Sequence, residues 1–304
     1  MPDSMPNLDT ASIAAELIAV IVAVTDGEPR VLTIEEGRVL PSGAFESGHR
    51  SLQAGLRSWV ERQTHHPLGY VEQLYTFADG DRTDSAAQRV VSISYLGLTR
   101  EARLAREPGA GWLSWYRFFP WEDCRAAAAT VAGEELMPRL RHWATGKRER
   151  QHRLAVNFGQ DGQRWNEELV LQRYELLWEA GLVPEAGGET ASPGQPMAHD
   201  HRRILATGIA RLRAKIKYRP VVFELMPPSF TLLQLQRTVE ALAGRLLHKQ
   251  NFRRLIDQQD LVEETGEVAT ETGGRPAKLF RFRREILAER AVVGTKLPLV
   301  RAVR

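Results

Sequence analysis

The chain has 304 residues, of which 43% are hydrophobic, so it can bury at least one sizeable core and is long enough for two or three domains. Its single cysteine, Cys124, excludes an internal disulfide and fits a reducing compartment. The net charge of +3 is unevenly distributed along the chain. Residues 201–304 carry 21 lysines and arginines against 10 acidic residues, a net charge of +11, which leaves −8 for residues 1–200. This asymmetry favours a polyanionic partner over a merely soluble basic domain.

The first 145 residues alternate between strand-like and helix-like segments. The polar start shows no signal-peptide pattern, and the apolar run 17–24 is far too short to cross a bilayer, so we expect a cytoplasmic protein without a membrane segment. Apolar spacing predicts one helix over 49–63 and a second over 121–144, with a break near Pro138. Strands are expected at 16–24, 29–34, 70–77 and 89–98. This order predicts a mixed α/β fold.

The middle of the chain reads as a connector. Residues 146–163 are charged and lack a clear period, 164–181 are amphipathic and end at Gly181, and 184–196 have the composition of a flexible linker or exposed loop. We therefore divide the chain into an α/β domain at 1–145, a helical connector and linker at 146–200, and a basic domain at 201–304.

The basic third has the element order of a winged helix-turn-helix. We expect a helix over 199–220, a short strand at 221–226, helices over 229–244 and 248–259, and two strands within 261–285. Thr231 and Gln234 have the spacing of a capping box.

In such a domain the second helix of the pair enters the major groove and the hairpin touches phosphates. The helix should place Phe252 and Leu255 toward the core. Arg281 on the hairpin is a further phosphate candidate. The alternative is a solvated charged helix beside an ordinary hairpin. The predicted DNA-binding residues are Lys249, Gln250, Asn251, Arg253, Arg254, Arg275 and Lys278.

Residues 43–65 resemble the Nudix box, G-x5-E-x7-R-E-U-x-E-E-x-G-U, where U is a bulky apolar residue. Gly43, Arg57, Trp59 and Glu61 match this pattern. Three of the family's four acids are replaced, by His49, Ser58 and Arg62, and the late glycine is Thr64. Nudix hydrolases hold divalent cations with clustered carboxylates, so a box with one acid predicts no catalytic residues, no metal site and no hydrolysis.

The resemblance extends along most of the chain outside about 146–198. The segments "YVEQLYTFADGDR", "RVVSISYLGL", "FELMPPSFTLLQLQRTVEALAG", "NFRR" and "GGRPAKLFRF" are similar to Nudix-related transcriptional regulators of NAD metabolism. That family implies an α+β Nudix-like sandwich followed by a C-terminal winged helix-turn-helix. It also implies a homodimeric repressor that binds double-stranded operator DNA and senses an adenine nucleotide, which is NAD, ADP-ribose or ATP, with no required cofactor.

We hypothesise that the former active-site cleft holds the pyrophosphate of this effector. Arg62 would replace part of the metal's charge, and Arg82 and Arg89 are further phosphate candidates. Tyr75, Phe77 and Trp112 offer aromatic rings for adenine, although on a strand at least one of Tyr75 and Phe77 should belong to the core. Two other functions stay open: a divergent nucleotide pyrophosphatase with an accessory nucleic-acid-binding domain, and an adaptor for RNA or protein.

Overall fold

The computed structural model describes residues 13–78, 89–101, 109–125, 135–187, 193–218, 221–269 and 276–283. Its centre is a six-stranded mixed sheet in the order β4-β5-β1-β2-β6, with β3 paired to the other end of β1. β1 is parallel to β5, and the other pairings are antiparallel. The strands are β1 (Ile13–Thr25), β2 (Glu28–Thr33), β3 (Ser42–Ala44), β4 (Tyr70–Phe77), β5 (Arg89–Leu98) and β6 (Gly111–Ser114).

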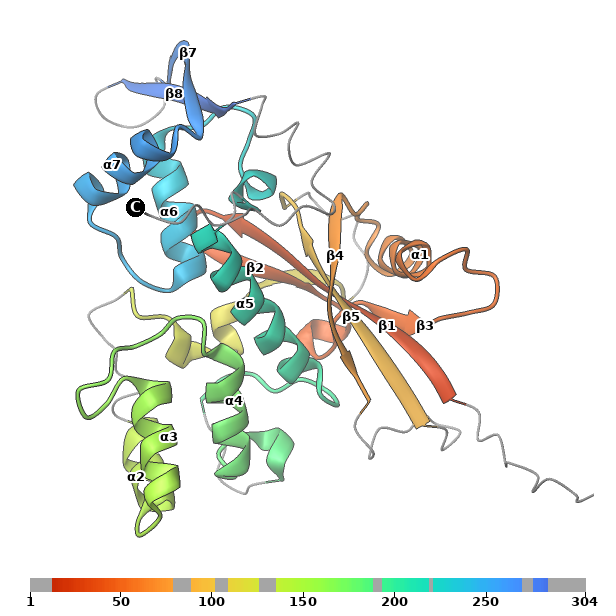
Figure 1. Cartoon of the computed structure of the whole chain (residues 1–304). Helices are drawn as coiled ribbons and strands as arrows, with labels where there is room; N and C mark the ends of the chain where they lie inside the picture. The colour runs from red at the N-terminus through yellow and green to blue at the C-terminus, as the bar shows by residue number, and fades with distance from the viewer. Residues whose placement is uncertain are drawn as a thin grey trace, which may run out of the picture.

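The central strand β1 is buried on both faces, which explains its continuous apolar sequence. Leu17, Ala19 and Ile21 belong to the core cluster that includes Leu56 and Val60 of helix α1 (Leu52–Thr64). The alternate side chains of β1 belong to a second, larger cluster that includes helix α5 (His201–Tyr218). The sheet therefore lies between α1 on one face and α5 on the other (Figure 1).

The connector is more helical than its sequence suggests. Residues 148–158, expected to be irregular, form α3 (Arg148–Phe158), because Leu154 and Phe158 share one buried face and pack beside α2 (Met137–Ala144). Gly159 ends α3 in the left-handed conformation. The amphipathic segment begins its helix later than expected, as α4 (Val170–Glu179).

One other expectation in this region is wrong. The helix predicted from Trp121 is instead a 3₁₀ turn, η3 (Pro120–Glu122), and the α-helix begins only at Met137 with Pro138 in its first turn. The Ala-rich residues 126–134 between them lie outside the described residues. At the end of the predicted linker the Gln195 amide donates to the Arg117 carbonyl, and the next described apolar residue, Met197, is buried.

The C-terminal third contains the expected helix pair and hairpin. Its elements are α6 (Leu232–Ala243), α7 (Lys249–Gln259), β7 (Val262–Ala269) and β8 (Ala277–Phe282). The capping box is confirmed, with Thr231 Oγ1 accepting from the Gln234 amide and Gln234 Oε1 accepting from the Thr231 amide. Residues 221–226 are not a strand, because Val221–Leu225 form a 3₁₀ helix, η6, that buries its apolar side chains.

The division of the chain at residue 201 stays a prediction. α5, which was placed in the basic domain, packs on α4 and on the sheet as well as on α6. Its Gly208 lies directly over Val20, where an added Cβ would come within 2.8 Å of a Val20 methyl carbon. None of the described helices is long and apolar enough to cross a membrane.

Candidate nucleic-acid interface and Nudix-like helix

Helix α7 presents a polar face to solvent. Phe252 and Ile256, four residues apart, are its buried side chains and fix it to the core. Leu255, expected in the core, is 49% exposed because it lies to one side of the stripe that Phe252 and Ile256 define. The predicted base-contacting residues are all exposed: Lys249, Gln250, Asn251, Arg253 and Arg254. The geometry therefore leaves this face free to enter a groove.

The position of each residue around α7 refines the prediction. At about 100° per residue, Arg254 points directly away from the Phe252–Ile256 side, and Gln250 and Gln258 lie near it at the spacing of one helical turn. Asp257 and Gln258, which are not among the predicted DNA-binding residues, share this outward face and are exposed. The signal that could have identified them is the helical period counted from Phe252.

The hairpin β7–β8 is fixed to the helices by aromatic side chains. Phe282 packs on Phe223 and Phe230 with ring centroids 3.6 and 4.6 Å apart, and the backbones of Phe230 and Phe280 form an isolated bridge. Lys278 pairs with Glu264 at 2.8 Å on this exposed surface. Arg281 similarly pairs with Glu263 at 2.7 Å, and Arg275 lies outside the described residues. Exposed pairs of this kind contribute about 0–1 kcal/mol, so a DNA phosphate can compete for both cations.

The segment that follows β6 holds the end of α6 by hydrogen bonds to the α6 backbone. The Tyr116 hydroxyl donates to the Ala241 carbonyl at 2.6 Å, and the Cys124 amide donates to the Gly244 carbonyl at 2.7 Å. Burial raises the pKa of Tyr116 to about 12, so its hydroxyl keeps its proton. Burial also raises the pKa of the Cys124 thiol, which agrees with an unreactive cysteine.

A buried ion network lies beside this attachment. Glu122 accepts hydrogen bonds from Arg173 of α4 at 2.5 and 2.8 Å and from Arg213 of α5 at 2.5 Å, and all three side chains are fully buried. Arg213 also donates to the Leu242 carbonyl of α6 at 2.9 Å. Burial alone would raise the pKa of Glu122, but the two guanidinium groups lower it below its ordinary value. The Glu122 carboxylate of η3 is thereby linked directly to α4 and α5, and through Arg213 to α6.

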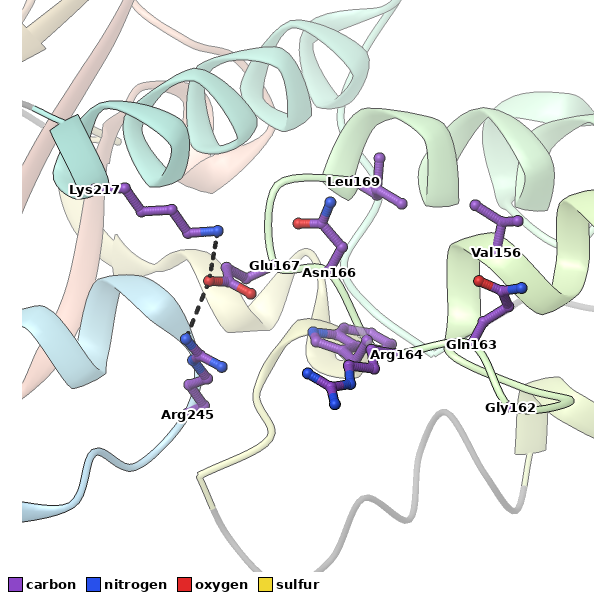
Figure 2. Close-up of a pocket in the computed structure, with 10 residues that line it drawn as sticks. Val156, Gly162, Gln163, Arg164, Asn166, Glu167, Leu169, Lys217 and Arg245 are labelled. Atoms are coloured by element: carbon purple, nitrogen blue, oxygen red, sulfur yellow. Dashed lines mark ion pairs between the residues drawn. The ribbon is translucent and has the colours of Figure 1, made fainter. Parts of the chain in front are cut away.

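A second acidic residue, Glu167, stands in a cleft of about 600 Å³ between the connector and the turn that joins α6 to α7. Its carboxylate, 7% exposed, pairs with Lys217 at 3.0 Å and with Arg245 at 3.3 Å (Figure 2). Arg164 lines the same cleft and is exposed. We call this feature the connector cleft. Sequence reasoning missed it because its lining comes from the connector, from α5 and from the α6–α7 turn, which are distant in the sequence.

The Nudix-like helix α1 carries the degenerate box. Ser51 caps it by accepting from the Ala54 amide. The Trp59 ring lies directly on Gly43, where an added Cβ would stand 2.2 Å from the indole, and its Nε1 donates to the Ala44 carbonyl at 2.8 Å. The glycine of the box therefore allows β3 and α1 to approach closely.

The altered acid positions of the box have local roles. Arg62 lies over the Trp59 ring, 4.5 Å from its centroid, and His49 Nδ1 accepts from the Glu46 amide at 3.0 Å. Among the described residues, no three His, Cys, Asp or Glu side chains are placed to hold a metal ion.

The other predicted effector residues are spread over both faces of the sheet. Phe77 is buried in the cluster on the α5 face of the sheet, and Tyr75, 58% exposed, packs edge-on against it at 5.0 Å. Arg89 is exposed at the start of β5 and donates to the Ala78 carbonyl at 3.0 Å. Trp112 packs against the α1-side cluster. Arg82 lies outside the described residues. The candidates that the structure describes therefore do not form a single cluster, and the role of all of them in ligand binding stays a prediction.

Comparison with known proteins identifies the C-terminal part. Residues 222–282 match the model of the NrtR DNA-binding winged helix domain. The chain is 42% identical over 86 residues to the ADPR responsive transcriptional repressor NtrR of Acinetobacter baylyi, and this alignment covers 28% of the chain and 34% of that protein. The match thus spans about a third of the length of this curated relative.

Solved structures show a similar fold over nearly the whole chain. The structure of Shewanella oneidensis NrtR complexed with a 27mer DNA has a TM-score of 0.55 at 21% identity, covering 90% of this chain and 95% of that one. A MutT/nudix family protein from Enterococcus faecalis has a TM-score of 0.51 at 15% identity, covering 92% and 90%. The predicted combination of a Nudix-like domain and a C-terminal winged helix is therefore confirmed.

Proposed function

We propose that this NrtR-like chain, which joins a Nudix-like domain to an NrtR-type winged helix, is a DNA-binding transcriptional repressor that responds to an adenine nucleotide. The observation that carries the proposal is the exposed polar face of α7, held beside the β7–β8 hairpin inside the segment that matches the NrtR DNA-binding domain. Arginine and glutamine side chains on a helix of this kind recognise guanine and adenine edges in the major groove.

The effector we propose for this chain is ADP-ribose, with NAD and ATP as the alternatives. The support is the curated relative, whose name describes an ADPR responsive repressor. Regulation requires that the nucleotide bind the DNA-competent and DNA-incompetent arrangements with different affinities. We further propose a homodimer, because two recognition helices must reach successive major grooves about 34 Å apart.

We also propose that the chain is not a hydrolase. Ser58 and Arg62 replace two of the box's carboxylates, and Arg62 adds a positive charge on the helix that would have to gather cations. The alternative function, a nucleotide pyrophosphatase, would be supported if the chain hydrolysed ADP-ribose or NAD in the presence of Mg²⁺ or Mn²⁺ and the Glu61→Gln variant did not.

Selection from a random duplex library, followed by binding of the selected duplex, tests the DNA-binding role. We expect Arg254→Ala to weaken binding about 5- to 150-fold, which corresponds to the 1–3 kcal/mol of one good base contact. Arg148→Ala is a matched control, because Arg148 is an exposed arginine at the start of α3. Failure to select any duplex, or normal binding by Arg254→Ala, would refute the assignment.

A separate measurement tests the effector. Calorimetry with ADP-ribose, NAD and ATP should show binding of at least one nucleotide by both the wild type and Arg254→Ala, because Arg254 lies on α7 and not on the Nudix-like domain. Arg62→Ala tests the predicted phosphate contact: an unchanged affinity would remove Arg62 from the ligand site.

A further inference from the structure

The connector cleft brings a basic side chain of the connector next to the helix-turn-helix. Arg245 follows Gly244, the residue that ends α6, and stands four residues before α7 begins at Lys249. Arg164 comes from the loop between α3 and α4. Figure 2 shows Arg164 and Arg245 on the same side of the cleft, with Lys217 on the far side of Glu167. Two segments that are about 80 residues apart therefore present cations to one space.

Glu167 forms ion pairs with two of the cleft's cations, but the carboxylates there do not neutralise all three. Burial alone would raise the pKa of Glu167, but hydrogen bonds and the charges of Lys217 and Arg245 lower it, so it is ionised at neutral pH. Lys217 also pairs with Glu168 at 2.7 Å. Arg164 forms no ion pair with any residue that the structure describes. The three cations therefore exceed the two carboxylates by one charge.

The neighbouring end of α7 adds to the positive potential. His248 occupies the N-cap position of α7 but its side chain makes no capping hydrogen bond, so the first amide groups of this 11-residue helix lack a side-chain partner at that cap. The N-terminus of a helix attracts anions. Arg245 remains 51% exposed while it pairs with Glu167, so its guanidinium can still reach an anion at this end of the helix.

We propose that the connector cleft is a second DNA-contacting surface, in which Arg164 and Arg245 bind a backbone phosphate that flanks the bases read by α7. The inference rests on the proposed function. Figure 1 shows the α6–α7 turn and the α3–α4 loop on the same side of the molecule as α7. A duplex whose major groove receives α7 therefore carries its flanking phosphates past this turn, at about one charge per 1.7 Å of helix axis. The connector thus extends the footprint of the winged helix.

The test measures operator affinity against salt concentration for the full chain and for Arg164→Ala, with Arg148→Ala as the matched control. Each lost phosphate contact reduces the slope of log affinity against log salt by about 0.9. We expect that reduction for Arg164→Ala and an affinity about 3- to 10-fold lower at low salt, which is the order of one phosphate contact. The control should keep the wild-type slope. With a duplex that lacks the flanking base pairs, Arg164→Ala and Arg148→Ala should show the same affinity and the same salt slope.

Two results would overturn this inference alone. The first is a wild-type slope for Arg164→Ala while Arg254→Ala is defective. The second is normal DNA binding by Arg164→Ala together with lost binding of ADP-ribose in calorimetry, which would make the cleft a site for a free phosphate ligand. A wild-type chain that binds no duplex would instead refute the proposed function together with this inference. Arg164 is exposed, so the variant is expected to fold, and circular dichroism would check this.

Discussion

Glu122→Gln should destabilise the protein more than any single change on its surface. The substitution removes the charge that compensates Arg173 and Arg213, two arginines with no exposed side-chain surface that cannot lose their protons. Breaking a buried pair in this way costs about 3–5 kcal/mol, a large part of the 5–15 kcal/mol typical of a folded domain. Urea unfolding followed by tryptophan fluorescence would measure the loss, because Trp165 and Trp115 lie within 3.9 and 6.0 Å of the two guanidinium carbons.

Matched variants separate the charge from the space that Glu122 fills. Glu61→Gln makes the same chemical change on an exposed residue of α1 and should alter stability by less than about 0.5 kcal/mol. Replacing all three charges together, Glu122→Leu with Arg173→Met and Arg213→Met, should restore much of the lost stability, because apolar groups of similar volume can substitute for a buried ion network. A loss below about 1 kcal/mol for Glu122→Gln would refute the reasoning.

Four further predictions concern the pH dependence of the ion network, the capping box, the Nudix-like helix and α7. The contribution of Glu122 should depend on pH: because its folded pKa is lowered below 4.5, this stabilisation is present above that value and is lost as the pH falls through the folded pKa, which acid titration of wild type against Glu122→Gln would show. Thr231→Ala removes half of the capping box and should cost about 1 kcal/mol in thermal unfolding. Gly43→Ala should cost about 1–3 kcal/mol because the new methyl group meets the Trp59 ring. Ile256→Ala should cost about 2–5 kcal/mol, whereas Leu255→Ala should stay within about 0.5 kcal/mol, and equal effects would contradict the orientation of α7.

The sequence predicted well those elements that depend on local signals. The capping box at Thr231 and the polar sequence of α7 each act within a few residues, so pattern and structure agree. The long apolar run of β1 likewise requires burial on both faces. The apolar spacing of residues 49–63 likewise placed α1 correctly, because the helical period of its buried side chains acts within a few turns.

What the sequence did not predict depends on contacts between distant segments. β3 and β6 have three and four residues and exist only because longer strands pair with them. α3 has few apolar residues, and its burial comes from α2 and α4. The internal ion network was missed because the division of the chain placed α5, and with it Arg213, in a separate basic domain. A signal was present, since the helical period along α5 places Arg202 and Arg213, both buried, on the same side of the helix as the buried Ile209 and Leu212.

The buried ion network also limits how a nucleotide could act at a distance. Within one chain α6 is held to the segment after β6 by Tyr116 and the Cys124 amide, and to α5 by Arg213, which is itself bound to Glu122. Rotating α6 relative to the sheet would break these bonds and expose two buried charges, at a cost of the same order as the 3–5 kcal/mol worked out above. A ligand shifts an equilibrium only by its differential affinity, which is commonly 1–3 kcal/mol of coupling. In the proposed homodimer we therefore expect an effector to move the sheet and winged helix of each subunit as one unit, and to change DNA affinity through the relative placement of the two subunits.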